Sequence, residues 1–204
     1  MARDDRRKKG RMPLRTSVAL VGDGLTEQIY FMDMRDTDRP ANLSIFPDFP
    51  RRVGSYRGVL DQAMGLVRDY TMVFALIDMD KVHQDGSLNN YQRDKARAER
   101  NGVRVLEQNP CFELWFLLHF VHTGRLFSNC DEVLPELRRQ GRLPGYDKSE
   151  RFQQAAHLYR NLRERLVANA IPNAILLEDQ QQGQDRLFPR AQVYKFFQWY
   201  LERL

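Results

Sequence analysis

Short apolar blocks along the chain predict a sheet of parallel strands. Residues 16–21 and 71–77 are apolar on both faces and contain several β-branched side chains, which is typical of strands buried inside a parallel sheet. Residues 43–49 alternate in the manner of a strand, although Pro47 limits that strand to a sheet edge or an early end. Residues 103–106 predict a fourth strand.

Helical spacing of apolar and polar residues separates these strands over residues 26–35, 56–70 and 91–101. The alternation predicts an α/β fold with a central, mostly parallel sheet of about four strands, joined by right-handed crossovers and flanked by helices. The remainder reads as mostly helical, with Pro110 placed as a first-turn helix residue. The later elements expected are helices over 111–120, 130–139, 149–168 and 191–204, and a short strand over 174–177.

We expect three parts: a basic flexible arm over residues 1–15, an α/β core over 16–125, and a mostly helical part over 126–204 that packs on the core. The formal net charge of +5 resides in the arm, which holds seven basic and two acidic residues, whereas the rest of the chain holds 25 of each. Such an arm suits contact with nucleic-acid phosphates, and a disordered, solubilising start explains it equally well. The nucleic-acid-binding candidates in the arm are Arg6, Arg7, Lys8, Lys9 and Arg11.

The overall composition excludes several classes of protein. Hydrophobic residues make up 42% of the chain and charged residues 29%, which is ordinary for a globular protein. No apolar run approaches the roughly 18 residues that span a bilayer, and no secretory signal pattern follows the basic start, so we expect a cytoplasmic protein with no membrane partner. Cys111 and Cys130 are too few for a disulfide framework or a structural zinc site, and we expect both to be reduced thiols.

Acidic residues follow three of the predicted strands. Asp23 comes after the first strand, Asp78 and Asp80 come after the third, and the segment from Glu107 to Glu113 follows the fourth, with Glu113 just inside the next helix. Ligands of parallel α/β sheets bind beyond the carboxyl ends of the strands, and carboxylates that converge there repel one another unless a cation is present. We therefore predict a site for Mg²⁺ (or Mn²⁺), which prefers carboxylate oxygens. Asp78 and Asp80 are the best ligands, because alternation along an extended chain places both carboxylates on one side.

Each of these signals is weak by itself. An Asp-x-Asp after a strand is often only a loop start with a helix-capping residue. The turn Gly-Asp-Gly-Leu-Thr-Glu over residues 22–27 is equally well explained as a tight strand-to-helix connection. It lacks the Gly-Lys-Ser/Thr ending of a P-loop and the third glycine of a dinucleotide-binding fingerprint.

The combination of the glycine turn, the Asp78-x-Asp80 pair and Glu113 resembles the Toprim fold, in which a glutamate after the first strand and an Asp-x-Asp after a later one bind Mg²⁺. Residues 109–120, Asn-Pro-Cys-Phe-Glu-Leu-Trp-Phe-Leu-Leu-His-Phe, closely resemble a signature of RloB-like proteins. These are prokaryotic proteins linked to restriction and phage-defence loci and often found beside an ATPase. The resemblance covers most of the chain, and only the twelve-residue signature is specific.

The resemblance implies a Mg²⁺-dependent nuclease, or a related phosphoryl-transfer enzyme, that acts on DNA or RNA in phage defence, with an ATPase from a neighbouring gene as a partner. Asp78 and Asp80 would hold the metal, and Asp23 would add a ligand or orient the attacking water, with support from Glu27. Glu113 would complete a second metal position, and Lys148 would stabilise charge on the phosphate.

One departure from the family pattern favours an alternative. Asp23 stands where the family usually has glutamate, so its carboxylate is one methylene shorter. The alternative is a non-catalytic Toprim-like module that binds nucleic acid or a partner ATPase. His119 is as well explained by a core position as by an active site, whereas we expect Trp115 and Cys111 to be core residues. Oligomeric state and the choice between DNA and RNA are left open.

Overall fold

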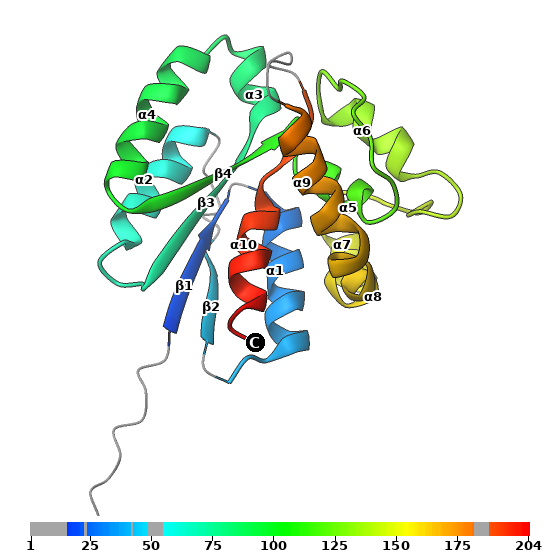
Figure 1. The fold of residues 1–204 in the computed structure, drawn as a ribbon, viewed down its shortest axis with the longest axis horizontal. Coiled ribbons are helices and arrows are strands. Elements are labelled where there is room, and N and C mark those ends of the chain that lie inside the picture. The colour runs from blue at the N-terminus through cyan, green and yellow to red at the C-terminus, as the bar shows by residue number, and fades with distance from the viewer. Residues whose placement is uncertain (1–15, 23, 42, 49–54, 182–187) are drawn as a thin grey trace, which may run out of the picture.

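The protein is built on one sheet (Figure 1). The computed structural model describes residues 16–22, 24–41, 43–48, 55–181 and 188–204. Within them, five strands lie in the order β2-β1-β3-β4-β5; the first four are parallel, and β5 pairs antiparallel with the end of β4. The strands are β1 Thr16–Val21, β2 Leu43–Asp48, β3 Met72–Asp78, β4 Val103–Asn109 and β5 Arg190–Ala191. The prediction of a mostly parallel α/β sheet is confirmed, with one strand more than expected.

Helices cover both faces of the sheet (Figure 1). α2 and α4 lie on one face, whereas α1 and the C-terminal helix α10 lie on the other, with α5 to α9 beyond them. Among the described residues, no helix combines the length and the apolar character needed to cross a membrane. The helices are α1 Leu25–Asp38, α2 Tyr56–Leu66, α3 Met79–Gln84, α4 Leu88–Arg100, α5 Glu113–Leu118, α6 Cys130–Leu137, α7 Glu150–Ala156, α8 Leu158–Arg165, the π-helical segment Leu166–Ala170, α9 Ile171–Gln180 and α10 Val193–Leu201.

The sheet separates two hydrophobic clusters because strand side chains alternate between its faces. Along β3, Val73 and Ile77 pack with α2 and α4, whereas Phe74 and Leu76 pack in the larger cluster on the other face. That larger cluster includes residues from both sides of residue 125, so residues 126–204 share a core with the preceding part of the chain. The ring of Phe197 in α10, for example, stacks on Trp115 at 5.4 Å between centroids.

Three local predictions are wrong. Residues 174–177, expected as a strand, lie within α9, because Ala174 and Leu177 are three residues apart on one buried helix face. Pro110 is not in the first turn of a helix: it follows a cis peptide bond, and α5 begins only at Glu113. The single helix expected over 149–168 is divided into α7 and α8 at His157, whose φ of 41° lies in the left-handed region and interrupts the helix.

Candidate functional site

The candidate site lies where the chain leaves two neighbouring strands, β1 and β3, in opposite directions. The chain leaves β1 for β2 on one side, and the next strand, β3, pairs with β1 on the other side. In parallel α/β sheets, ligands bind beyond the carboxyl ends of the strands at such a divergence. Asp78 ends β3 at this edge, and the glycine turn follows β1. Asp23 lies outside the described residues, as do the arm residues Arg6, Arg7, Lys8, Lys9 and Arg11.

Gly24 allows the first turn of α1 to place a carboxylate at this edge. A Cβ at position 24 would collide with the carboxylate of Glu27, which folds back over the backbone just before the helix. Only glycine permits this close approach. Glu27 is buried, and its charge lies at a helix N-terminus, where the helix dipole favours an anion.

The Asp-x-Asp pair is anchored by the loop after β4. Pro110 O accepts hydrogen bonds from the backbone N–H groups of Met79 and Asp80, both at 3.0 Å. The extended chain ends at Asp78, and α3 begins at Met79, so strand alternation is the wrong reason for placing both carboxylates on one side. Asp80 lies in the first turn of α3, where its Oδ1 accepts a hydrogen bond from Lys81 N at 2.7 Å. Their role as metal ligands stays a prediction.

Glu113 is the most enclosed carboxylate of the site. It opens α5 and is 2% exposed. Its Oε1 accepts a hydrogen bond from Tyr146 OH at 2.9 Å and lies 3.0 Å from Lys148 Nζ. Burial raises the pKa of Tyr146, and the Glu113 charge raises it further, so the phenol stays protonated and donates to the carboxylate. Tyr146 and Lys148 therefore both contact α5, the helix of the signature segment, through the Glu113 side chain.

Lys148 links the three acidic residues. Burial by itself would lower its pKa, but Glu113, and then Asp78 and Glu27, raise the pKa above its ordinary value. The ammonium is therefore charged, and it lies in the combined field of carboxylates from α1, the end of β3 and the start of α5. The structure brings together Glu27, Asp78, Glu113 and Lys148, which are far apart in the sequence. Among these four residues, one ammonium therefore lies in the field of three carboxylates.

The two cysteines are not reduced thiols, contrary to expectation. Cys111 and Cys130 form a disulfide that joins the start of the signature segment to the first residue of α6. Sequence spacing did not reveal it, because only the fold brings the two Cα atoms to 5.5 Å. Cys130 Sγ lies 2.9 Å from Glu113 Oε2 and 3.1 Å from Lys148 Nζ. A disulfide sulfur carries no hydrogen, so its contact with the carboxylate is not a hydrogen bond.

Gln108 is a site residue that sequence reasoning missed. It lies beside Asp78 in the parallel register of β3 and β4, and it is fully buried. Neither its Nε2 nor its Oε1 has a hydrogen-bond partner within the described part of the chain. A buried amide without partners is costly, so such groups are often found where a ligand or water completes the bonding. The signal for Gln108 that the sequence offered was an amide side chain close to the apolar residues of a buried strand.

A cavity adjoins the same edge of the sheet. It has a volume of about 280 Å³ and lies between the N-terminal end of α2 and the C-terminal end of β3. Asp78 lines it together with Lys81, Asp85 and Asn90, while Ile77 and Val82 contribute apolar surface. Asp78 therefore belongs both to the acidic cluster and to the wall of a space that admits a small polar group.

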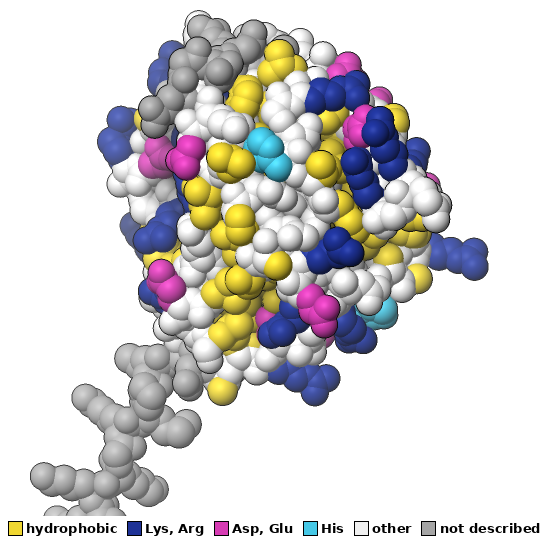
Figure 2. Space-filling view, turned by 45° about the vertical axis from the view of Figure 1, so that its right-hand side comes forward, with side chains coloured by type: hydrophobic (Ala, Val, Ile, Leu, Met, Phe, Trp, Pro, Cys, Tyr) yellow, Lys and Arg dark blue, Asp and Glu magenta, His cyan; other side chains and the backbone are white. Residues whose placement is uncertain are grey.

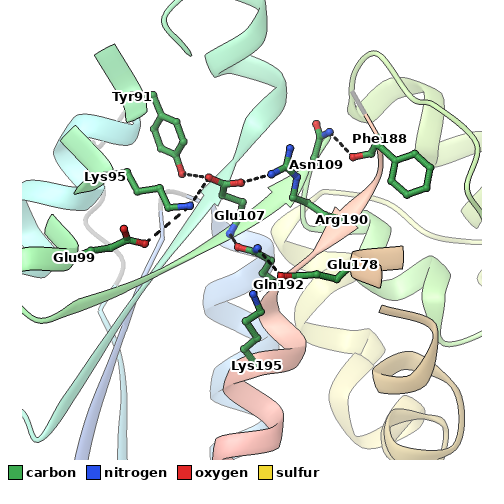
Figure 3. Close-up of polar contacts among 10 residues, drawn as sticks. All are labelled: Tyr91, Lys95, Glu99, Glu107, Asn109, Glu178, Phe188, Arg190, Gln192 and Lys195. Carbon is green, nitrogen blue, oxygen red and sulfur yellow. Dashed lines mark hydrogen bonds and ion pairs between the residues drawn. The ribbon is translucent and has the colours of Figure 1, made fainter. Parts of the chain in front are cut away.

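A second buried glutamate lies within β4 and forms the network shown in Figure 3. Glu107 accepts hydrogen bonds from Tyr91 OH at 3.0 Å and Lys95 Nζ at 2.8 Å, and its other oxygen lies 2.6 Å from Arg190 Nη1. Gln192 Oε1 accepts a hydrogen bond from the backbone N–H of Glu107. Burial by itself would raise the pKa of Glu107, but Lys95 and Arg190 outweigh it and hold the pKa below its ordinary value. The predicted strand 103–106 was too short to place Glu107 inside the sheet.

His119 and Trp115 are core residues. Trp115 is fully buried and donates from Nε1 to Tyr30 OH at 3.1 Å. His119 is also fully buried, and its Nδ1 lies 2.9 Å from Trp115 O. Burial lowers the pKa of His119 to about 4, so the ring is neutral. The sequence allowed a core position or an active-site position for His119, and the structure places it in the core.

The donor atoms of the site suit a hard cation. Glu27, Asp78 and Glu113 offer carboxylate oxygens, which Mg²⁺ prefers, and Mg²⁺ needs only one or two of them because it keeps several waters. Within the described residues, only Cys111, Glu113 and Cys130 bring three candidate ligand atoms within 4.8 Å of one another. The two sulfurs of that trio are bonded to each other, so it is not a metal site in this state. The carboxylates of Glu27, Asp78 and Glu113 therefore have the donor chemistry that Mg²⁺ prefers, but the three are not gathered within that distance of one another.

Comparison with known proteins agrees with the signature in α5. No curated protein and no solved structure matches the chain. The family model of the RloB-like protein matches residues 18–198. This range contains the whole candidate site and all five strands of the described sheet, apart from the first two residues of β1. The chain therefore belongs to the RloB-like protein family.

Proposed function

We propose that the protein is a Mg²⁺-dependent nuclease, or a related phosphoryl-transfer enzyme, that acts on nucleic acid in prokaryotic phage defence through a Toprim-like fold. The observation that carries the proposal is the position of the Lys148 ammonium among the carboxylates of Glu113, Asp78 and Glu27, at the sheet edge where the chain leaves β1 and β3 in opposite directions. A phosphodiester and a divalent cation together match this charge pattern, because the cation balances the carboxylates and Lys148 faces the phosphate. Membership of the RloB-like family supports the assignment.

Each residue of the site then has a stated task. Asp78 and Asp80 hold the cation, Glu113 offers a second position, and Asp23, with Glu27, completes the set or orients the attacking water. Bound Mg²⁺ would supply charge neutralisation and an activated water. Lys148 is kept protonated by the surrounding carboxylates, so it stabilises negative charge on the phosphate oxygens. Tyr146 fixes the Glu113 carboxylate by donating to Oε1.

A non-catalytic role is the second candidate, and one observation favours it. Glu113 already accepts a hydrogen bond from Tyr146 and pairs with the Lys148 ammonium, and the disulfide sulfur lies against its other oxygen, so its charge is matched without a metal ion. A module of this kind would bind nucleic acid or a partner ATPase without cleaving anything. It would retain affinity for nucleic acid in EDTA and show no cleavage with Mg²⁺ or Mn²⁺.

Metal binding measured by calorimetry tests the proposal first. We expect wild-type protein to bind Mg²⁺ and Mn²⁺, and Asp78→Ala to lose that binding while remaining folded by circular dichroism. Asp61→Ala is the matched control, since Asp61 is an exposed α2 carboxylate paired with Arg97 outside the site. Cleavage of DNA and RNA is then assayed with the ATPase from the neighbouring gene included. Equal binding and equal cleavage by wild type and Asp78→Ala would overturn the assignment.

A further inference from the structure

Four arginines gather at the C-terminal end of α6, around one carboxylate. Glu136 Oε1 lies 2.9 Å from Arg125 Nη1 and 2.7 Å from Arg139 Nη2, and Oε2 lies 3.2 Å from Arg142 Nη1. The fourth, Arg138, donates from Nε to Tyr146 O at 2.8 Å. We call these four residues with Glu136 the arginine cluster. Figure 2 shows Lys and Arg side chains grouped around acidic ones toward the upper right of its view.

The charges of the arginine cluster do not balance. Three guanidinium groups share one carboxylate, so the group carries two positive charges in excess even before Arg138 is considered. Two arginines on the opposite face of the sheet are each paired with one carboxylate: Arg97 with Asp61, and Arg57 with Asp94. An excess of cations held this close is unfavourable unless an anion approaches from solvent.

The guanidinium groups are positioned to accept such an anion. Each contact with Glu136 uses one terminal nitrogen, whereas a guanidinium group has five N–H donors. Arg125 and Arg139 are more than half exposed. Arg125 also stacks over the buried ring of Phe127, at 5.2 Å from its centroid, which holds the side chain in place. Fixed, exposed guanidinium groups suit phosphate oxygens, which they bind in a bidentate manner.

The arginine cluster is joined to the candidate site by a short relay of contacts. Arg138 holds the backbone of Tyr146, whose hydroxyl donates to Glu113, and Lys148 follows two residues later on the same carboxylate. A polymer with regularly spaced phosphates is therefore able to contact the arginine cluster and Lys148 together.

We propose that the arginine cluster binds the phosphodiester backbone of a nucleic acid and leads it to the site at Lys148. The binding is independent of sequence, because guanidinium contacts to phosphates carry no base information. This inference rests on the proposed function only for what happens to the bound nucleic acid at Lys148. Binding itself is measured without catalysis.

The test is the affinity of fluorescently labelled single-stranded DNA, duplex DNA and single-stranded RNA for the full chain in EDTA, over a series of salt concentrations. The double variant Arg125→Ala/Arg139→Ala removes two exposed charges. We expect its affinity to fall roughly tenfold at low salt, and the slope of log affinity against log salt to decrease by about two. Arg93→Ala/Arg100→Ala removes two exposed charges from α4 and is the matched control, expected to bind as wild type does.

A second variant changes the charge in the other direction. Glu136→Gln removes the carboxylate that the three guanidinium groups share, so we expect tighter binding and a steeper salt slope. Unchanged affinity and slope in both variants would overturn the proposal, as would equal losses in the α4 control. Loss of affinity for an acidic peptide, with none for nucleic acid, would also overturn it. If wild type binds through the arginine cluster but never cleaves with Mg²⁺, the proposed nuclease fails and this inference stands.

Discussion

Glu107 and Glu113 lie close together in the chain, one within β4 and the other at the start of α5, and both are nearly inaccessible to solvent. Each accepts a hydrogen bond from a tyrosine hydroxyl, and each has a lysine within 3.0 Å. Their surroundings differ in charge. Glu107 lies between two cations, Lys95 and Arg190, whereas Lys148, the cation that pairs with Glu113, also lies in the field of Asp78 and Glu27.

This difference separates a structural carboxylate from a candidate functional one. The Glu107 network is complete within the protein, and it ties β4 to α4 and to β5. In the Glu113 cluster, one lysine lies in the field of three carboxylates, and the side chain of this Lys148 is about half exposed. Burial and hydrogen bonding alone do not distinguish the two sites, since both glutamates have them. The local balance of charge does.

The largest effect on stability is expected from Glu107→Gln. The amide cannot balance Lys95 and Arg190, so two cations remain in a poorly solvated place, and the free energy of unfolding should fall by about 4 kcal/mol. Urea unfolding monitored by circular dichroism measures this. Glu99→Gln is the control, because Glu99 is exposed and lies farther from Lys95, at 4.0 Å. A loss in Glu107→Gln no larger than in this control would remove the distinction.

His119 provides a buried titratable group with no opposite charge. Its pKa is lowered from about 6.5 in the unfolded chain to about 4, chiefly by burial. The unfolded chain therefore binds a proton first, and the stability that is fully present above about pH 6.5 should fall by about 3 kcal/mol as the pH falls to about 4. In His119→Asn this part of the pH dependence should disappear. His157→Asn is the control, because His157 is exposed and its left-handed backbone suits asparagine; this variant should keep the pH dependence of wild type. Identical pH profiles in wild type and His119→Asn would show that the charged ring is tolerated.

A smaller effect, on activity and not on stability, is expected from Glu113→Gln. It removes one of the three carboxylates that act on Lys148, and the other two remain, so the protein should be about as stable as wild type. If the proposed function holds, cleavage should fall roughly 100-fold, which corresponds to about 2.7 kcal/mol in the barrier. Cleavage per folded molecule should be unchanged in Glu107→Gln. The reverse result, with cleavage lost at Glu107 and kept at Glu113, would exchange the roles of the two sites.

Local signals in the sequence were sufficient for the sheet and for the family. A strand that is apolar on both faces, such as β3, is recognised from neighbouring residues alone, and so is the twelve-residue signature around Glu113. Both predictions are confirmed. The positions of Glu27, Asp78 and Glu113 near strand ends followed from chain order, because parallel strands end at one edge. The strand expected over 174–177 failed because a short apolar run suits a strand and a buried helix equally well.

The sequence by itself determined which acidic residues stand near the ends of the strands and to which family the chain belongs. Only the tertiary structure decided which of the buried carboxylates are balanced. Glu107 meets Arg190, Cys111 meets Cys130 and Glu113 meets Lys148 through packing between segments distant in the chain. The energy of a buried charge depends on these distant neighbours, because water no longer screens them. Periodicity records local geometry, so it contains no information about such pairs.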